Sequence, residues 1–259
     1  MNRIDLNCDM GEGLGVYSLG DDEAMLDVVT SANLACGFHA GDPLVMYRAL
    51  SSARAKGVAA GAHPSFLDLW GFGRRPILGE RPADVEKHVI YQIGAAQALA
   101  VAAGTSLVHV KLHGSLANMA NEDDELADAV ANAIGIVSRD LIFVVMPGLA
   151  TERAALRAGL PLAREVYADR AYGPGGNLVS RKQAGSVIHD VDAAVARVLR
   201  MVEAQSIETQ DGGAIRTRID SVAVHGDTPG AVAMARRIRD ALVQAGMELR
   251  PMAEVIASS

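Results

Sequence analysis

The stretch Arg3-Ile4-Asp5-Leu6-Asn7-Cys8-Asp9 alternates apolar and polar residues, which is the period of a β-strand. Alternate side chains of a strand share a face, so Asp5, Asn7 and Asp9 point one way and Cys8 points the other way. Acidic and amide side chains on one face of an otherwise apolar strand indicate the polar lumen or mouth of a barrel. The opposite face then packs against a shell of helices, where a thiol behaves as a small hydrophobe.

Further short apolar runs follow along the chain, and each strand candidate precedes a segment with helical periodicity. The strand candidates are Arg3 to Cys8, Ser31 to Cys36, Gly57 to Ala62, Leu107 to Leu112, Leu141 to Met146, Arg164 to Ala168 and Ser221 to Val224. The helix candidates are Asp22 to Val29, Pro43 to Lys56, Pro82 to Ala103, Asp123 to Val137, Leu149 to Ala158, Val191 to Glu203 and Pro229 to Ala245. This alternation is typical of βα units around a parallel sheet.

Seven βα units without a dinucleotide-binding fingerprint favour a closed or nearly closed β/α barrel over an open doubly wound sheet. No linker and no shift in composition divides the chain, so we expect a single domain over residues 1–259. Two long connections, 64–81 and 169–188, interrupt the regular spacing, and loops of this length usually cover an active site. Asp42-Pro43 and Thr228-Pro229 each place a capping oxygen before a proline, which predicts a helix start.

The composition is that of a globular protein, because 50% of the 259 residues are hydrophobic and 21% are charged. The formal net charge of −7 comes from 31 acidic and 24 basic residues, and the basic ones are not clustered, so we expect no binding to nucleic acid. No uncharged apolar run reaches the length of about 18 residues that a bilayer span needs. Two cysteines, Cys8 and Cys36, and the absence of a signal-peptide pattern indicate a reduced, cytoplasmic setting.

Ionisable side chains gather at the carboxyl ends of the predicted strands, where barrel enzymes hold their active sites. Four of the seven histidines follow a strand, and strand parity places Lys111 on the same face as His113. A cluster of histidine, aspartate and lysine at one rim is suited to general acid and base catalysis. The candidate catalytic residues are Asp9, His39, His63, Lys111, His113, His225 and Asp227.

Some polar residues have a purely structural interpretation beside the functional one. Asp42 either caps the helix that begins at Pro43 or belongs to the site. Asp5 and His109 lie deep within their strands, so we predict that they are hydrogen-bonded polar groups of the core.

The residue spacing leaves a bound divalent metal open. Histidine and aspartate on separate strand ends, such as Asp9, His39 and His63, could supply ligands, but no H-E-x-x-H motif occurs. A metal in the barrel mouth is therefore not predicted. A P-loop nucleotide site is excluded, because no Gly-Lys dipeptide is followed by serine or threonine.

Several ordered motifs make the whole chain resemble the LamB/YcsF family. They are Asp5-Leu6-Asn7-Cys8-Asp9-Met10-Gly11-Glu12, Ala32-Asn33-Leu34-Ala35-Cys36-Gly37-Phe38-His39-Ala40-Gly41-Asp42, Gly61-Ala62-His63-Pro64, Gly71-Phe72-Gly73-Arg74-Arg75, Ala168-Asp169-Arg170 and Val224-His225-Gly226-Asp227-Thr228. The fourth strand departs from the family pattern at two positions. Leu112 replaces the usual proline and Ala117 replaces the usual tyrosine, while Lys111 and His113 are retained.

The resemblance implies a distorted seven-stranded parallel (β/α)7 barrel, similar to glycoside hydrolases and deacetylases. It also implies the A subunit of an ATP-dependent 5-oxoprolinase, which hydrolyses 5-oxoproline to glutamate together with the B and C subunits. ATP, with Mg²⁺, is expected to act through those partners. The residues expected to bind substrate are Asn7, Glu12, Asn33, Asp42, Arg74, Arg75, Asp169 and Arg170.

Each step of lactam hydrolysis requires a chemical role that residues at the barrel rim can perform. Asp9 or a neighbouring histidine is the expected base for water, Lys111 stabilises the oxyanion, and His113 or His225 protonates the leaving nitrogen. Arginines would hold a carboxylate or phosphoryl group, because a guanidinium fits planar anions. The alternatives are a metal-dependent amide or N-acetyl hydrolase of the polysaccharide-deacetylase type and a non-catalytic subunit that binds carbohydrate or lactam.

Overall fold

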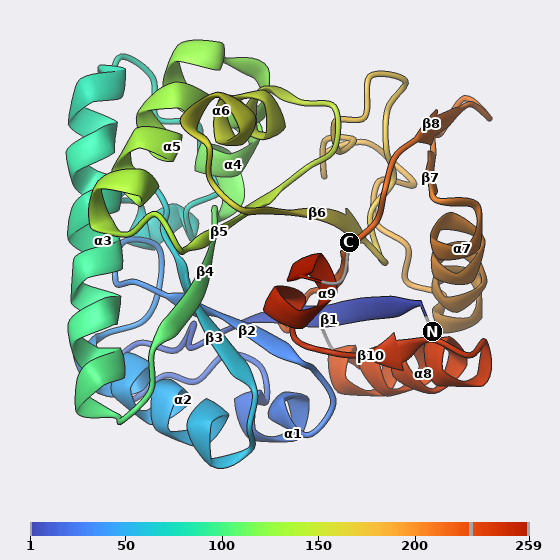
Figure 1. Cartoon of the computed structure of the whole chain (residues 1–259), viewed down its shortest axis with the longest axis horizontal. Helices are drawn as coiled ribbons and strands as arrows, with labels where there is room; N and C mark the ends of the chain where they lie inside the picture. Colours follow the sequence, from blue (N-terminus) through green and yellow to red (C-terminus); the bar gives the residue numbers. More distant parts are fainter. Residues whose placement is uncertain (1, 228–229, 258–259) are drawn as a thin grey trace.

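A ring of seven parallel strands forms the centre of the computed structural model, which describes residues 2–227 and 230–257 (Figure 1). Its strands are β1 (Arg3–Met10), β2 (Ser31–Ala35), β3 (Ala59–His63), β4 (Leu107–Lys111), β5 (Ile142–Val145), β6 (Leu162–Tyr167) and β9 (Ser221–Val224). Each strand pairs with the next one, and β9 pairs with both β6 and β1, which closes the ring. The predicted (β/α)7 barrel is thereby confirmed.

Helices surround this ring and follow the predicted segments closely. They are α1 (Asp22–Leu26), α2 (Pro43–Ala55), α3 (Pro82–Ala102), α5 (Asp124–Val137), α6 (Ala150–Ala158), α7 (Val191–Ala204) and α8 (Ala231–Gln244). Helix α1 is shorter than predicted, because the chain turns after Asp27 to enter β2. Thr228-Pro229, the predicted start of α8, lies outside the described residues. Among the described helices, none is long and apolar enough to cross a membrane.

The sequence did not predict six short elements. They are η1 (Leu69–Gly71), α4 (Gly114–Glu122), β7 (Ser206–Glu208), β8 (Ala214–Arg216), β10 (Glu248–Leu249) and α9 (Met252–Ala257). Strands β7 and β8 form an antiparallel hairpin, and β10 pairs with the start of β1. Met252 of α9 is buried against Ile142, Val144 and Ala163. These short elements are stabilised by contacts with the rest of the fold, so the local sequence pattern does not predict them.

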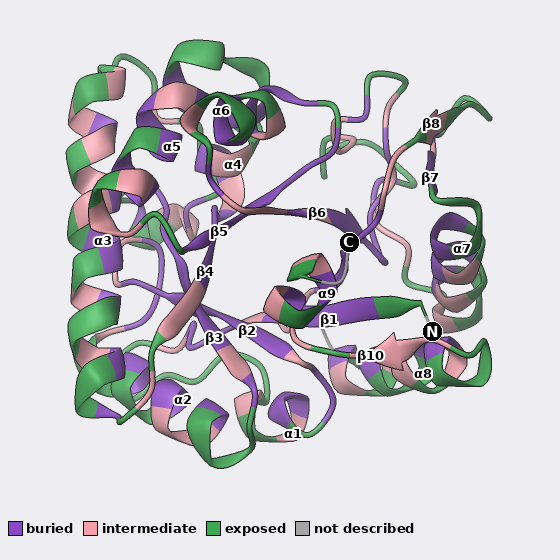
Figure 2. Cartoon of the chain, viewed as in Figure 1, coloured by how far each residue is buried: buried purple, intermediate pink, exposed green. Residues whose placement is uncertain are grey.

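The barrel has an apolar shell and a polar lumen. On β1, Leu6 and Cys8 belong to the hydrophobic core between strands and helices, whereas Asp5 and Asn7 are fully buried on the lumen face. Figure 2 shows the central strands mostly buried. Asp5 accepts hydrogen bonds from the hydroxyl groups of Thr30, Ser31 and Ser221, so the predicted core role of this carboxyl group is confirmed. Burial nevertheless raises the pKa of Asp5 to about 6.

Two glycines offer a matched test of this packing. A Cβ at Gly61 on β3 would overlap the ring of His109, whereas a Cβ at Gly94 in α3 meets open space. We expect Gly61→Ala to destabilise the fold by about 1–3 kcal/mol through overpacking. Gly94→Ala should stabilise it by up to about 1 kcal/mol, because alanine is the better helix former. Urea unfolding measures both, and an equal effect of the two substitutions would contradict the tight contact at Gly61.

Candidate active site

A cavity of about 450 Å³ opens at the carboxyl ends of the barrel strands. That volume lies within the range of small-molecule sites, roughly 300–1,000 Å³. Side chains from several strands and from the long connection 169–188 line it. Among the lining residues are Asp9, His63, Arg74, Lys111, His113, Glu165, Tyr167, Arg170, Arg181 and His225. The topology therefore brings together five of the seven predicted catalytic residues.

A buried ion cluster forms one wall of the cavity. The Nζ atom of Lys111 lies 3.0 Å from Oδ1 of Asp9 and 3.1 Å from Oε1 of Glu165. Burial disfavours the charged form of Lys111. The nearby Asp9 and Glu165 carboxylates outweigh this effect and hold the pKa of Lys111 well above its ordinary value. Burial likewise opposes the Asp9 carboxylate, whose pKa is held well below its usual range by His63 and Lys111. This wall therefore presents an ammonium group and a carboxylate at neutral pH.

Two predicted substrate-binding residues lie beneath this cluster. The amide nitrogen of Asn7 donates to Glu165 at 2.8 Å, and that of Asn33 donates to Asp9 at 2.9 Å. Asn7 and Asn33 are fully buried. In the structure they hold the charged groups in position from below and do not line the cavity.

His225 and Asp169 form a second pair at the cavity. Nδ1 of His225 lies 2.8 Å from Oδ2 of Asp169, and Nε2 lies 3.1 Å from a guanidinium nitrogen of Arg181. A guanidinium can only donate, so Nε2 carries a lone pair and Nδ1 carries the proton that Asp169 accepts. Burial opposes the Asp169 carboxylate, yet the adjacent His225 imidazole and its hydrogen bond hold the pKa of Asp169 below its ordinary value. A carboxylate that orients an imidazole in this way is an arrangement suited to proton transfer.

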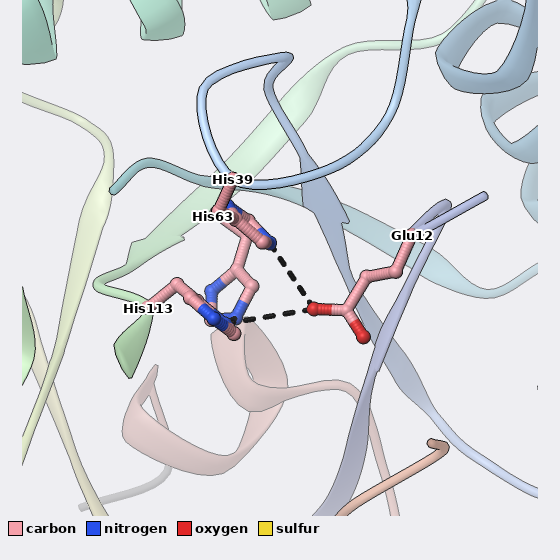
Figure 3. A group of neighbouring side chains, drawn as sticks. All are labelled: Glu12, His39, His63 and His113. Atoms are coloured by element: carbon pink, nitrogen blue, oxygen red, sulfur yellow. Dashed lines mark hydrogen bonds and ion pairs between the residues drawn. The ribbon is translucent and has the colours of Figure 1, made fainter. Parts of the chain in front are cut away.

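Glu12 and three histidines lie together (Figure 3), and Nε2 of His63 is 3.4 Å from Oδ2 of Asp9. Oε1 of Glu12 is 3.1 Å from Nε2 of His39 and 3.5 Å from Nδ1 of His113, and Nε2 of His63 is 3.0 Å from Nδ1 of His113. Burial, reinforced by the neighbouring imidazoles, holds the pKa values of His39 and His113 well below their ordinary value. We call Glu12, His39, His63 and His113 the histidine cluster.

Guanidinium groups make the cavity mouth basic. Arg74 pairs with Asp227 at 2.7 Å and lies over the ring of Phe72. Arg170 is buried and donates to the carbonyl oxygen atoms of Val179 and Ser186, so it also fastens the 169–188 connection. Asp227, predicted to be catalytic, lies at the rim as the partner of Arg74 and does not line the cavity.

Two predicted substrate-binding residues are directed elsewhere. Asp42 is the N-cap of α2, because Oδ1 accepts from the backbone N–H groups of Leu44 and Val45. The capping interpretation of Asp42 is thus confirmed. Arg75 pairs with Asp68 within its own loop and is not part of the cavity lining.

Sequence reasoning missed Glu165 and Tyr167. Both lie on β6, where an acid and an aromatic residue two positions apart share the lumen face. Strand parity, which places Asp9 on the lumen face of β1, also places Glu165 and Tyr167 on one face of the predicted strand Arg164 to Ala168. Tyr167 stacks on His225, with ring centroids 5.5 Å apart, and its ring faces Lys111. Leu112 and Ala117, the two departures from the family pattern, also line the cavity.

A closed ring of seven βα units with a polar cavity at its carboxyl face defines a (β/α)7 barrel. Solved structures with this fold include the T48 deacetylase, with a TM-score of 0.52 and 13% identity over 100% of this chain and 92% of that one. Residues 4–257 match the LamB/YcsF family. The chain belongs to that family.

Relatives in the same family align over nearly their whole length. The 5-oxoprolinase A subunit of Rhodopseudomonas palustris (strain BisB18) is 52% identical, over 98% of this chain and 99% of its own. The 5-oxoprolinase A subunit of Gluconobacter oxydans (strain 621H) is 48% identical, over 96% and 98% of the two chains. A solved structure, the lactam utilization protein of Thermus thermophilus, has a TM-score of 0.90 and 44% identity over 96% of this chain and 99% of that one.

Proposed function

We propose that this chain is the A subunit of an ATP-dependent 5-oxoprolinase, which opens 5-oxo-L-proline to L-glutamate together with the B and C subunits. One observation carries the proposal. The cavity combines a buried lysine and carboxylate cluster with an oriented His225 and several guanidinium groups. It does so in a chain that is 52% identical to the A subunit of a 5-oxoprolinase.

Ring opening requires water to add to the amide carbonyl, an oxyanion to be stabilised and the ring nitrogen to be protonated. The Lys111 ammonium group lines the cavity, where it can stabilise the oxyanion. His225 accepts a proton from water at Nε2 and returns it to the leaving nitrogen. Asp169 keeps the imidazole in the tautomer that this exchange needs.

The arginines at the cavity mouth are suited to bind the anionic groups of the substrate. Arg74, Arg170 and Arg181 line the same cavity as Lys111 and His225. A guanidinium binds a carboxylate or phosphoryl group with two parallel hydrogen bonds. These arginines would therefore hold the substrate carboxylate or a phosphoryl group that activates the lactam. Arg75, which pairs with Asp68, is left out of this role.

Dependence on partner subunits is the direct test of the proposal. An unactivated lactam is a poor electrophile, and ATP with Mg²⁺ is assigned here to the B and C subunits. We expect the purified chain with ATP and Mg²⁺ to release no appreciable glutamate from 5-oxoproline, and the reconstituted complex to release glutamate and phosphate in equal amounts. Assays of both products decide this. Equal rates from the isolated chain and the complex would contradict the division of labour, and an inactive complex would contradict the function.

A further inference from the structure

The histidine cluster has the dimensions of a metal site. A tetrahedral ion with metal–nitrogen bonds of about 2.05 Å places its ligand atoms about 3.3 Å apart. The neighbouring donor atoms of Glu12, His39, His63 and His113 lie 3.1, 3.5 and 3.0 Å apart, and all four lie within 4.8 Å of one another. These residues are 1–7% exposed. They come from different segments of the chain, so only the fold brings them together.

The hydrogen bonds of two histidines fix which ring nitrogen carries a proton. Nδ1 of His63 lies 2.7 Å from the carbonyl oxygen of Lys111, and Nε2 of His113 lies 2.8 Å from that of Phe72. A carbonyl oxygen only accepts, so both of these nitrogen atoms are protonated in the neutral ring. The other nitrogen of each ring therefore presents a lone pair, and these two lone pairs face each other at 3.0 Å. Two facing lone pairs at this distance repel each other unless a proton or a metal ion lies between them.

The remaining members of the cluster add two more donor atoms. Nε2 of His39 and Oε1 of Glu12 lie beside the facing nitrogen atoms of His63 and His113 (Figure 3). Glu12 has a further acidic neighbour in Asp9, whose Oδ2 lies 3.4 Å from Nε2 of His63. A divalent cation would offset this concentration of electron pairs.

We propose that Glu12 Oε1, His39 Nε2, His63 Nε2 and His113 Nδ1 bind one divalent metal ion, for which Zn²⁺ is the best match. Three imidazoles and a carboxylate suit a tetrahedral zinc ion. The carbonyl oxygen atoms of Lys111 and Phe72 then serve as outer partners that orient two of the ligands. His63 and His113 also line the cavity, so the ion would lie at its edge, beside Asp9. Metal binding by these four side chains does not depend on the proposed reaction.

Zinc binding by the chain alone tests this proposal. Protein stripped with a chelator should take up one zinc ion per chain, measured by elemental analysis after gel filtration. X-ray absorption of the zinc-loaded protein should show imidazole and oxygen ligands and no sulfur. His63→Ala and His113→Ala should each weaken zinc binding by more than about 100-fold in a competitive titration, because even an outer partner contributes about 10- to 100-fold. Glu12→Gln, which keeps the shape of the side chain, should also weaken it.

The control is His189→Ala, which removes an exposed imidazole outside the cavity. It should bind zinc as the unaltered chain does. Circular dichroism shows whether each variant folds. If an alanine variant does not fold, zinc binding by Glu12→Gln and the X-ray absorption spectrum of the unaltered chain test the site. Failure of the unaltered chain to bind zinc, or equal binding by His189→Ala and the folded ligand variants, would overturn the proposal. Because the experiment uses neither partner subunits nor substrate, this result is independent of whether the complex is a 5-oxoprolinase.

Discussion

Lys111→Met is expected to abolish turnover by the assembled enzyme and to destabilise the chain by about 3–5 kcal/mol, the usual effect of breaking a buried ion pair. The substitution keeps most of the side-chain volume but removes the only ammonium group near Asp9 and Glu165 in the described part of the chain. Two carboxylates would then remain buried without a counter-charge. The oxyanion of the proposed reaction would also lose its stabilising charge.

Urea unfolding and steady-state kinetics measure the two effects separately. The control is Lys87→Met, because Lys87 is exposed and pairs with Glu86 at the surface, and its loss should change stability by less than about 0.5 kcal/mol. A double variant, Lys111→Met with Glu165→Gln, should recover part of the stability, because one unpaired carboxylate is neutralised, but none of the activity. Normal turnover by Lys111→Met would remove this lysine from the mechanism.

The second large effect is expected at the His225 and Asp169 pair. His225→Ala should lower kcat by about 10² to 10⁴, which is the usual contribution of a general acid or base. Asp169→Asn should lower kcat as well, because an amide no longer favours the tautomer with a lone pair on Nε2. His225 is only 11% exposed and its loss removes the partner of the buried Asp169 carboxylate, so we also expect the free energy of unfolding to fall by about 1–3 kcal/mol.

Kinetics of the reconstituted complex, together with thermal unfolding of each variant, distinguish catalysis from folding. His189→Ala serves as the control here too, because it removes an exposed histidine outside the cavity. Turnover by His225→Ala at the rate of the control would place the proton transfer elsewhere. An effect on KM alone would assign His225 to substrate binding.

Particular residues show how far local patterns reach. Strand parity on residues 3–9 correctly predicted a polar lumen, and Asp5 and Asn7 are buried there. The same alternation is visible on β6, where it points to Glu165, a residue that the predicted site omits. For Asp42 the sequence allowed a cap and a site role equally, and only the hydrogen bonds to Leu44 and Val45 confirmed the cap.

The amino-acid sequence was enough to predict the seven βα units, the inward face of strands such as β1 and β4, and the rim where ionisable side chains gather. These features follow from periods of two and 3.6 residues and from caps, which act within a few positions of the chain. The pairing of β9 with β1, the orientation of His225 by Asp169, and the meeting of Glu12 with three histidines became visible only in the folded chain. Such contacts join residues far apart in the chain, and their distances depend on how the closed barrel packs as a whole.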